Sequence, residues 1–223
     1  MNCLGVLMLD TRFPRLRGDI GNPRTFDHPV RYAVVEGASP QRVVRESDPD
    51  LLLPFIAAGR RLVAEGAGAI ATSCGFLVLW QRELQAALPV PVWTSSLLLV
   101  PELHAGRPAD GRVGVLTVDA QSLGVRHLQA AGAAPDTPLE GLEPGSPFQR
   151  SLLDNRTELD AGDARLQVVG AAERLLERHP GVADIVLECT NMSPYADAVR
   201  RATGRRVHDV TTLIAQRFAA QTH

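Results

Sequence analysis

The chain has 223 residues, of which 45% are hydrophobic and 22% charged, and its formal net charge at pH 7 is −2. This composition is ordinary for one large globular domain or two small ones, and the near-neutral charge offers no basic field for nucleic acid. All basic residues are arginine, which excludes the lysine that a pyridoxal phosphate enzyme or a P-loop requires.

The cysteine count and the hydropathy pattern exclude further classes. Three cysteines do not make a disulfide framework, and no C-x-x-C pair indicates zinc. No apolar stretch approaches the roughly 20 residues of a membrane span. The apolar run 1–9 lacks a basic flank and ends at Asp10, so a secretory signal is not expected. We therefore expect a cytoplasmic protein.

Apolar runs typical of buried strands alternate with helical patterns, which predicts an α/β fold with mostly parallel sheets. We expect strands at residues 3–9, 30–35, 69–73, 90–94, 113–118, 183–188 and 206–209. We expect helices near residues 50–65, 76–88, 95–104, 120–131, 163–178, 194–202 and 211–220. The stretches 11–29 and 134–155 are predicted as long loops, and loops of that length are commonly functional.

The two halves of the chain repeat each other. The run 4–10 resembles the run 113–119 at an offset of 109, whereas Cys74 and Cys189 are 115 residues apart. The strands that follow keep the second offset, with Val92 against Val207. Two α/β halves related by a pseudo-twofold axis would bring their strand ends together across a cleft.

Cys74 and Cys189 each follow an apolar run and precede a predicted helix. In an open α/β fold the carboxyl ends of strands hold ligands, and a helix start there favours an anion. The same environment lowers the pKa of a thiol. We therefore expect two thiolate-forming cysteines that face each other across one substrate.

Two facing thiols have the geometry of a base and an acid. Removing a proton from one face of a carbon acid and returning one to the other face inverts the centre without a metal or an organic cofactor. Preorganised donors after each cysteine would hold the substrate carboxylate and the developing charge. The side chains and backbone groups that we assign to this substrate site are those of Ser73, Gly75, Phe76, Thr190 and Asn191.

These strand-end cysteines, together with Asp10 after the first strand, resemble the aspartate/glutamate racemase superfamily. That group includes amino-acid and hydantoin racemases, maleate isomerases and arylmalonate decarboxylases. The resemblance implies two pseudo-symmetric Rossmann-like lobes with the active site between them. It places residues 1–97 and 210–223 in the first lobe and residues 98–209 in the second. It also implies two-base racemisation by Cys74 and Cys189, with Asp10 acting on a cysteine.

The flanking residues depart from the amino-acid racemases. Those enzymes usually carry Cys-Asn-Thr at the first site, where this chain has Cys74-Gly75-Phe76. At the second site Glu188 precedes the cysteine, and Asn191 occupies the place of an acid–base helper. These departures indicate a subgroup of unassigned specificity.

The predicted loop after the first strand supplies further candidates. Arg24 is a candidate clamp for a carboxylate, and Asn22 and Thr25 are candidate hydrogen-bonding partners. Thr117 falls at a strand end and is a candidate lining residue of the cleft.

The sequence thus predicts an isomerase, a cofactor-independent racemase or epimerase of a small carboxylate. The alternatives are a maleate-type isomerase or an arylmalonate-type decarboxylase on the same scaffold, and a non-catalytic ligand-binding protein. The expected partner is a small carboxylate, with neither nucleic acid, membrane nor metal, and a homo-oligomer is left open.

Overall fold

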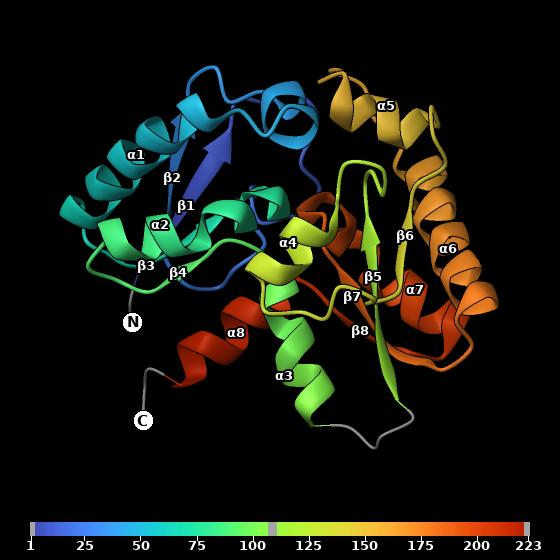
Figure 1. The fold of residues 1–223 in the computed structure, drawn as a ribbon. Helices are drawn as coiled ribbons and strands as arrows, with labels where there is room; N and C mark the ends of the chain where they lie inside the picture. Colours follow the sequence, from blue (N-terminus) through green and yellow to red (C-terminus); the bar gives the residue numbers. More distant parts are fainter. Residues whose placement is uncertain (1–2, 107–110, 221–223) are drawn as a thin grey trace.

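The computed structural model describes residues 3–106 and 111–220 and contains two parallel four-stranded sheets (Figure 1). The first has the order β2-β1-β3-β4 and the second the order β6-β5-β7-β8. The first-sheet strands are β1 (Cys3–Leu9), β2 (Val30–Val35), β3 (Ala67–Thr72) and β4 (Val92–Trp93). Those of the second sheet are β5 (Arg112–Thr117), β6 (Leu139–Gly141), β7 (Val182–Leu187) and β8 (Arg206–His208). The predicted α/β fold with two pseudo-symmetric lobes is confirmed.

Helices flank each sheet. Those of the first lobe are the π-helix η1 (Gln41–Arg45), the 3-10 helices η2 (Pro49–Leu51) and η3 (Gly75–Trp80), α1 (Leu52–Ala64) and α2 (Gln81–Ala87). Those of the second are α4 (Val125–Ala130), α5 (Pro147–Leu153), α6 (Ala161–Arg178), the 3-10 helix η5 (Thr190–Tyr195) and α7 (Ala196–Thr203). No helix within residues 3–106 and 111–220 is long and apolar enough to cross a bilayer.

Three further helices complete the chain. The 3-10 helix η4 (Ser96–Leu98) and α3 (Leu99–Ala105) lie between β4 and β5, and α8 (Val210–Ala220) ends the described chain. Leu213 and Ile214 of α8 are buried in one apolar cluster with Leu4 and Val6 of β1. The last helix therefore packs on the first sheet. The residue limits assigned above to the two lobes remain a prediction, and residues 1–2, 107–110 and 221–223 within them lie outside the described chain.

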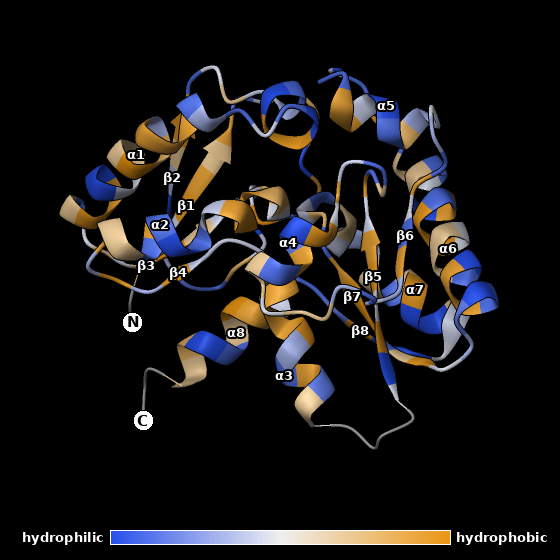
Figure 2. Ribbon diagram, viewed as in Figure 1, coloured by the Kyte–Doolittle hydropathy of each residue, from blue (hydrophilic) through white to orange (hydrophobic). Residues whose placement is uncertain are grey.

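The repeat extends to the pairing of the central strands. The β1–β3 register shifts between Cys3 and Leu4, and the β5–β7 register shifts between Arg112 and Val113. Figure 2 shows that residues of both sheets are mainly apolar, whereas α1 and α6 mix apolar and polar residues. Strands buried on both faces read as continuous apolar runs, which is why the sequence located most of them.

Glycine at the same place in β1 and β5 lets a covering side chain approach the strand. A Cβ atom on Gly5 would lie 2.6 Å from Ile70 Cδ1, and one on Gly114 would lie 2.8 Å from Leu175 Cδ2. Both separations are too short for real atoms, so the close packing of each sheet depends on these glycines. The shared requirement explains the similarity of the two runs.

The stretch 134–155 is more ordered than we predicted. It contains the short strand β6 and the helix α5, so its assignment as a loop is wrong. By contrast, residues 11–29 contain neither helix nor strand. This first loop runs beside the carboxyl ends of the strands, where it contributes to the site.

Candidate functional site

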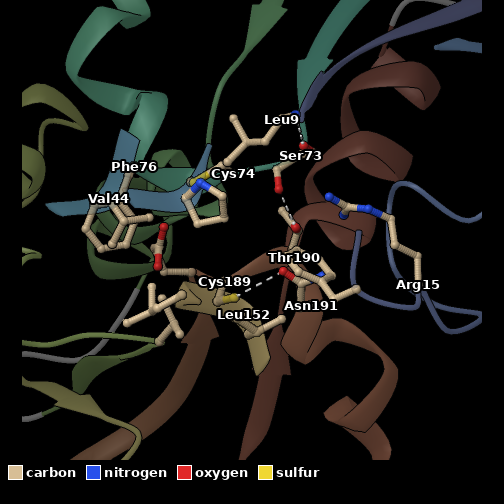
Figure 3. A pocket seen from close by; sticks show the side chains of 16 residues that line it. Leu9, Arg15, Val44, Ser73, Cys74, Phe76, Leu152, Cys189, Thr190 and Asn191 are labelled. Atoms are coloured by element: carbon tan, nitrogen blue, oxygen red, sulfur yellow. Dashed lines mark hydrogen bonds between the residues drawn. The ribbon is translucent and has the colours of Figure 1, made fainter. Parts of the chain in front are cut away.

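Cys74 and Cys189 line one cavity of about 30 Å³ between the two lobes. Cys74 lies between β3 and η3, and Cys189 lies between β7 and η5. Figure 3 shows the two side chains in the same pocket, brought there by segments of opposite lobes. Parallel strands place their carboxyl ends at one sheet edge, and the repeat brings those two edges together.

Most of the other lining side chains are apolar and come from both lobes. The first lobe contributes the loop after β1 and the segment around η1, and the second contributes α5 and the residue after β5. These residues are Leu9, Phe13, Pro40, Val44, Phe76, Val118, Leu152 and Leu153. A cavity of this volume is large enough to hold water.

Arg15 is the cation of the cavity wall, and the sequence analysis did not select it. Its guanidinium donates to Asp19 Oδ1 at 2.9 Å and to Thr11 Oγ1 at 3.0 Å. Asp19 is itself buried and accepts from Asn191 Nδ2 at 2.5 Å and from Gly21 N at 2.7 Å. A buried carboxylate thus fixes the orientation of an arginine that suits recognition of a second carboxylate.

Hydrogen bonds between the lobes hold the two strand ends together. Thr190 Oγ1 donates to the Ser73 carbonyl at 2.8 Å, while Ser73 Oγ accepts from Leu9 N at 3.0 Å (Figure 3). Ser96 Oγ donates to the Leu187 carbonyl at 2.7 Å. Both hydroxyl-to-carbonyl bonds are buried, where hydrogen bonds are costly to leave unmade.

Both thiols lie in an environment that favours the protonated form. Burial, followed by the negative charge of Glu188, raises the pKa of Cys74 to about 12 and raises that of Cys189 well above its ordinary value. The backbone N–H groups of Phe76 and Asn191 lower these pKa values, as expected at a helix start. Burial outweighs them in this cavity, so our expectation of lowered thiol pKa values is wrong.

Glu188 also lines the cavity, and the sequence analysis noted it only as a departure from a motif. Its Oε2 accepts from Thr117 Oγ1 at 2.7 Å. Burial raises the pKa of Glu188 to about 7, against a lowering contribution from the Thr117 hydroxyl. The sequence feature that could have identified Glu188 is a charged residue directly after the apolar run 182–187.

The structure brings together most of the expected site. Seven residues selected from sequence line the cavity: Ser73, Cys74, Gly75, Phe76, Cys189, Thr190 and Asn191. Thr117 is buried directly behind them, against Glu188.

Asp10 lies outside the cavity wall. It is exposed, and its Oδ2 accepts from Gly37 N at 3.1 Å, which caps the turn after β2. Its action on a cysteine stays a prediction.

The arginine that we selected in the loop after β1 as a carboxylate clamp also lies outside the cavity wall. Arg24 is exposed and is not part of the cavity wall. Asn22 Nδ2 donates to the Arg15 carbonyl at 2.7 Å, and Thr25 Oγ1 donates to the Asp19 carbonyl at 2.6 Å. Asn22 and Thr25 therefore shape the loop that presents Arg15, and Arg15 is the arginine at the cavity.

Comparison with known proteins identifies the family. The chain is 32% identical over 214 residues to a dimethylsulfoniopropionate lyase of Durusdinium sp. clade D, covering 92% of this chain and 70% of that protein. The chain belongs to the dimethylsulfoniopropionate lyase family. It is also 32% identical to dimethylsulfoniopropionate lyase 6 of Emiliania huxleyi, covering 94% of this chain but only 57% of that protein. No protein-family model matches the chain.

Solved structures relate the fold to racemases and decarboxylases. An allantoin racemase from Klebsiella pneumoniae superimposes with a TM-score of 0.67 at 16% identity, over 100% of this chain and 89% of that one. Unliganded arylmalonate decarboxylase gives a TM-score of 0.57 at 15% identity, over 93% and 86%. These neighbours share the aspartate/glutamate racemase-like fold that the sequence led us to expect.

The family corrects the expected activity. The curated relatives are named as lyases, so the prediction of a racemase or epimerase, and with it the isomerase class, is wrong. The fold and the pair of cysteines were insufficient to distinguish a lyase from a racemase.

Proposed function

We propose that the chain is a lyase that cleaves dimethylsulfoniopropionate into dimethyl sulfide and acrylate. The proposal rests on the 32% identity over 92% of the chain to a protein of that name. The cavity supports it with an arginine for a carboxylate, two thiols and an apolar wall. As in the sequence analysis, the partner is a small carboxylate and no cofactor is needed.

The reaction is an elimination. A base removes a proton from the carbon next to the carboxylate, and the electron pair left behind forms the double bond of acrylate. The carbon–sulfur bond breaks with its electrons moving to sulfur, so dimethyl sulfide leaves as a neutral molecule. The leaving group needs no proton. One base is therefore sufficient, whereas inversion needs a base and an acid on opposite faces.

Arg15 is the proposed partner of the substrate carboxylate. Its side chain is only 11% exposed and its orientation is held by the buried carboxylate of Asp19. Negative charge grows on the substrate carboxylate as the α-proton leaves. A positive group fixed before the reaction stabilises that charge in the transition state.

Cys74 is the proposed base. Although burial raises the pKa of both thiols, the charge of Arg15 lowers that of Cys74, whereas Asp19 further raises that of Cys189. Cys189 Sγ also lies 3.7 Å from Asn191 Oδ1, to which it donates as a thiol. These charges favour ionisation of Cys74, and in this proposal Cys189 covers the other face of the substrate.

The direct test is turnover by the purified protein. With dimethylsulfoniopropionate as substrate, dimethyl sulfide is measured by headspace gas chromatography and acrylate by proton NMR. We expect both products in equal amounts. Cys74→Ala should lower kcat by about a hundredfold or more, in line with the loss of a general base, and Cys189→Ala by less.

Cys3→Ala provides the matched control, because Cys3 lies at the start of β1 and outside the cavity wall. It should retain wild-type turnover. Absence of dimethyl sulfide from wild-type reactions would contradict the proposed function. A larger loss in Cys189→Ala than in Cys74→Ala would instead assign the base to Cys189.

A further inference from the structure

Glu188 is a buried carboxyl group for which the elimination described above has no use. Its side chain is 1% exposed, and Oε2 accepts from the Thr117 hydroxyl at 2.7 Å. Oε1 has no hydrogen-bond partner among the described residues, and Glu188 forms no ion pair with them. Burying a carboxylate without a partner is costly, so this oxygen needs a reason to be there.

The opposite lobe leaves space for this carboxyl group. A Cβ atom on Gly75 would lie 2.2 Å from Glu188 Oε1, so the glycine beside Cys74 is what admits the side chain. Gly75, Glu188 and both cysteines belong to the same cavity wall. Residues of two lobes are thus matched to place one unpaired acidic oxygen beside the thiols.

The surroundings favour a cation without N–H groups. A primary ammonium needs several acceptors, but Glu188 Oε1 is a single oxygen without a partner, and Glu188 shares the cavity wall with apolar residues such as Val44, Phe76 and Leu152. A metal ion needs several ligands, and no group of three His, Cys, Asp or Glu side chains suited to a metal occurs within residues 3–106 and 111–220. An alkylated onium group requires only negative charge and apolar contact.

We propose that Glu188 is the counter-ion of the substrate's onium group. The cavity then selects zwitterions with a carboxylate at Arg15 and an alkylated sulfonium or ammonium at Glu188. The identity of that onium as dimethylsulfonium rests on the proposed function. Selection for the positive charge itself is independent of turnover and can be tested separately.

The electrostatics of the cavity link this contact to the thiols. The charge of Glu188 raises the pKa of both cysteines. A bound cation offsets that charge, so substrate binding makes Cys74 easier to ionise. The titratable and charged groups that line the cavity with Glu188 are Cys74, Cys189 and Arg15, and Asp19 acts on Cys189 from behind Arg15.

The test compares two unreactive or slowly reacting ligands of similar shape. One is 3-(trimethylammonio)propanoate, which carries the cation, and the other is 4,4-dimethylpentanoate, in which an uncharged tert-butyl group replaces that cation. Isothermal titration calorimetry on the wild-type protein should show preference for the cation by about tenfold or more, as expected for a partly buried charge pair. Equal affinity for the two ligands would overturn the proposal without any variant.

Glu188→Gln should abolish this preference while keeping affinity for 4,4-dimethylpentanoate. Glu36→Gln is the matched control, because Glu36 directly follows β2 as Glu188 follows β7, but it is exposed. It should keep the wild-type preference. A preference that survives unchanged in Glu188→Gln, with its fold verified by circular dichroism, would overturn the proposal.

Proton release provides a second readout in the wild-type protein. Because the pKa of Glu188 is raised to about 7, a cation that lowers it should expel a proton on binding at pH 7. Titrations in buffers of different ionisation enthalpy measure that proton, and binding of 4,4-dimethylpentanoate should release less. If the cation preference holds but no dimethyl sulfide forms, the proposed function fails and the role of Glu188 stands.

Discussion

At the residue scale, Gly75 combines a steric and a chemical requirement. A side chain there would meet Glu188 Oε1 at 2.2 Å and the Glu188 carbonyl oxygen at 2.7 Å. The backbone atom cannot move aside as a flexible side chain can. Gly75 therefore fixes the distance at which the two lobes meet beside the thiols.

We predict that Gly75→Ala lowers the free energy of unfolding by about 1–3 kcal/mol, the usual cost of overpacking. Gly124→Ala is the control, since a Cβ atom at Gly124 meets nothing within 4 Å and the backbone φ of −98° suits any residue. Urea denaturation of both variants provides the measurement. Equal stability of the two variants would contradict the close contact.

A second residue-scale prediction concerns the two arginines. Arg15→Gln should raise KM for dimethylsulfoniopropionate by about tenfold or more, because a charge-assisted hydrogen bond contributes about 1.5–3 kcal/mol. Arg24→Gln should leave KM unchanged, since Arg24 is exposed and outside the cavity wall. Steady-state kinetics of dimethyl sulfide release would separate them. A raised KM in Arg24→Gln, with an unchanged KM in Arg15→Gln, would instead identify Arg24 as the residue that binds the substrate carboxylate.

Among the larger elements, the loop after α5 is hydrogen-bonded to the loop after β1 beside the cavity. Arg12 N donates to Asn155 Oδ1 at 2.6 Å, and Asn155 Nδ2 donates to the Asp10 carbonyl at 3.3 Å. Asn155 has a φ of +54°, a conformation that asparagine tolerates better than most residues. We call these two hydrogen bonds of Asn155 the latch. The latch adjoins Leu152 and Leu153, which line the cavity.

We predict that Asn155→Gly opens the latch without straining the backbone, because glycine adopts a positive φ freely. Amide hydrogen exchange in α5 should become faster, and KM should rise as the closed complex becomes less stable. Exchange followed by mass spectrometry provides the measurement, with α6 as an internal reference. Unchanged exchange in α5 would show that the latch does not hold the cover.

Element by element, the sequence was most informative where burial on both faces leaves a continuous apolar run, as in β1, β5 and β7. It missed β6, which has only three residues, and α5, whose Pro147 and Arg150 interrupt an apolar pattern. It located the two cysteines because they follow such runs. Arg15 was missed because its place depends on the path of a loop.

At the scale of the whole molecule, two buried groups oppose each other as pH changes. The pKa of Glu188 is raised to about 7, and the pKa of His127 is lowered to about 4, in both cases mainly by burial. The Glu188 contribution to stability is present at low pH and is lost as pH rises towards 7. The His127 contribution is present above its ordinary pKa and is lost as pH falls towards 4.

We therefore predict that Glu188→Gln changes the pH dependence of stability. The difference in unfolding free energy, wild type minus variant, should be larger at pH 5 than at pH 8 by up to about 3 kcal/mol. The variant retains the His127 effect, so its own stability should fall on acidification. Urea midpoints across this pH range provide the measurement, and a constant difference would contradict the raised pKa of Glu188.

The bonds from Thr190 to Ser73 and from Ser96 to Leu187 join the lobes beside the cysteines, whereas the Asn155 latch joins them near the cavity cover. The lobes are thus joined both next to the sulfur atoms and farther out at the cavity cover. We therefore expect that breaking the outer contacts moves the cover more than the sulfur atoms. Such an opening would change access to the reacting groups while keeping their spacing.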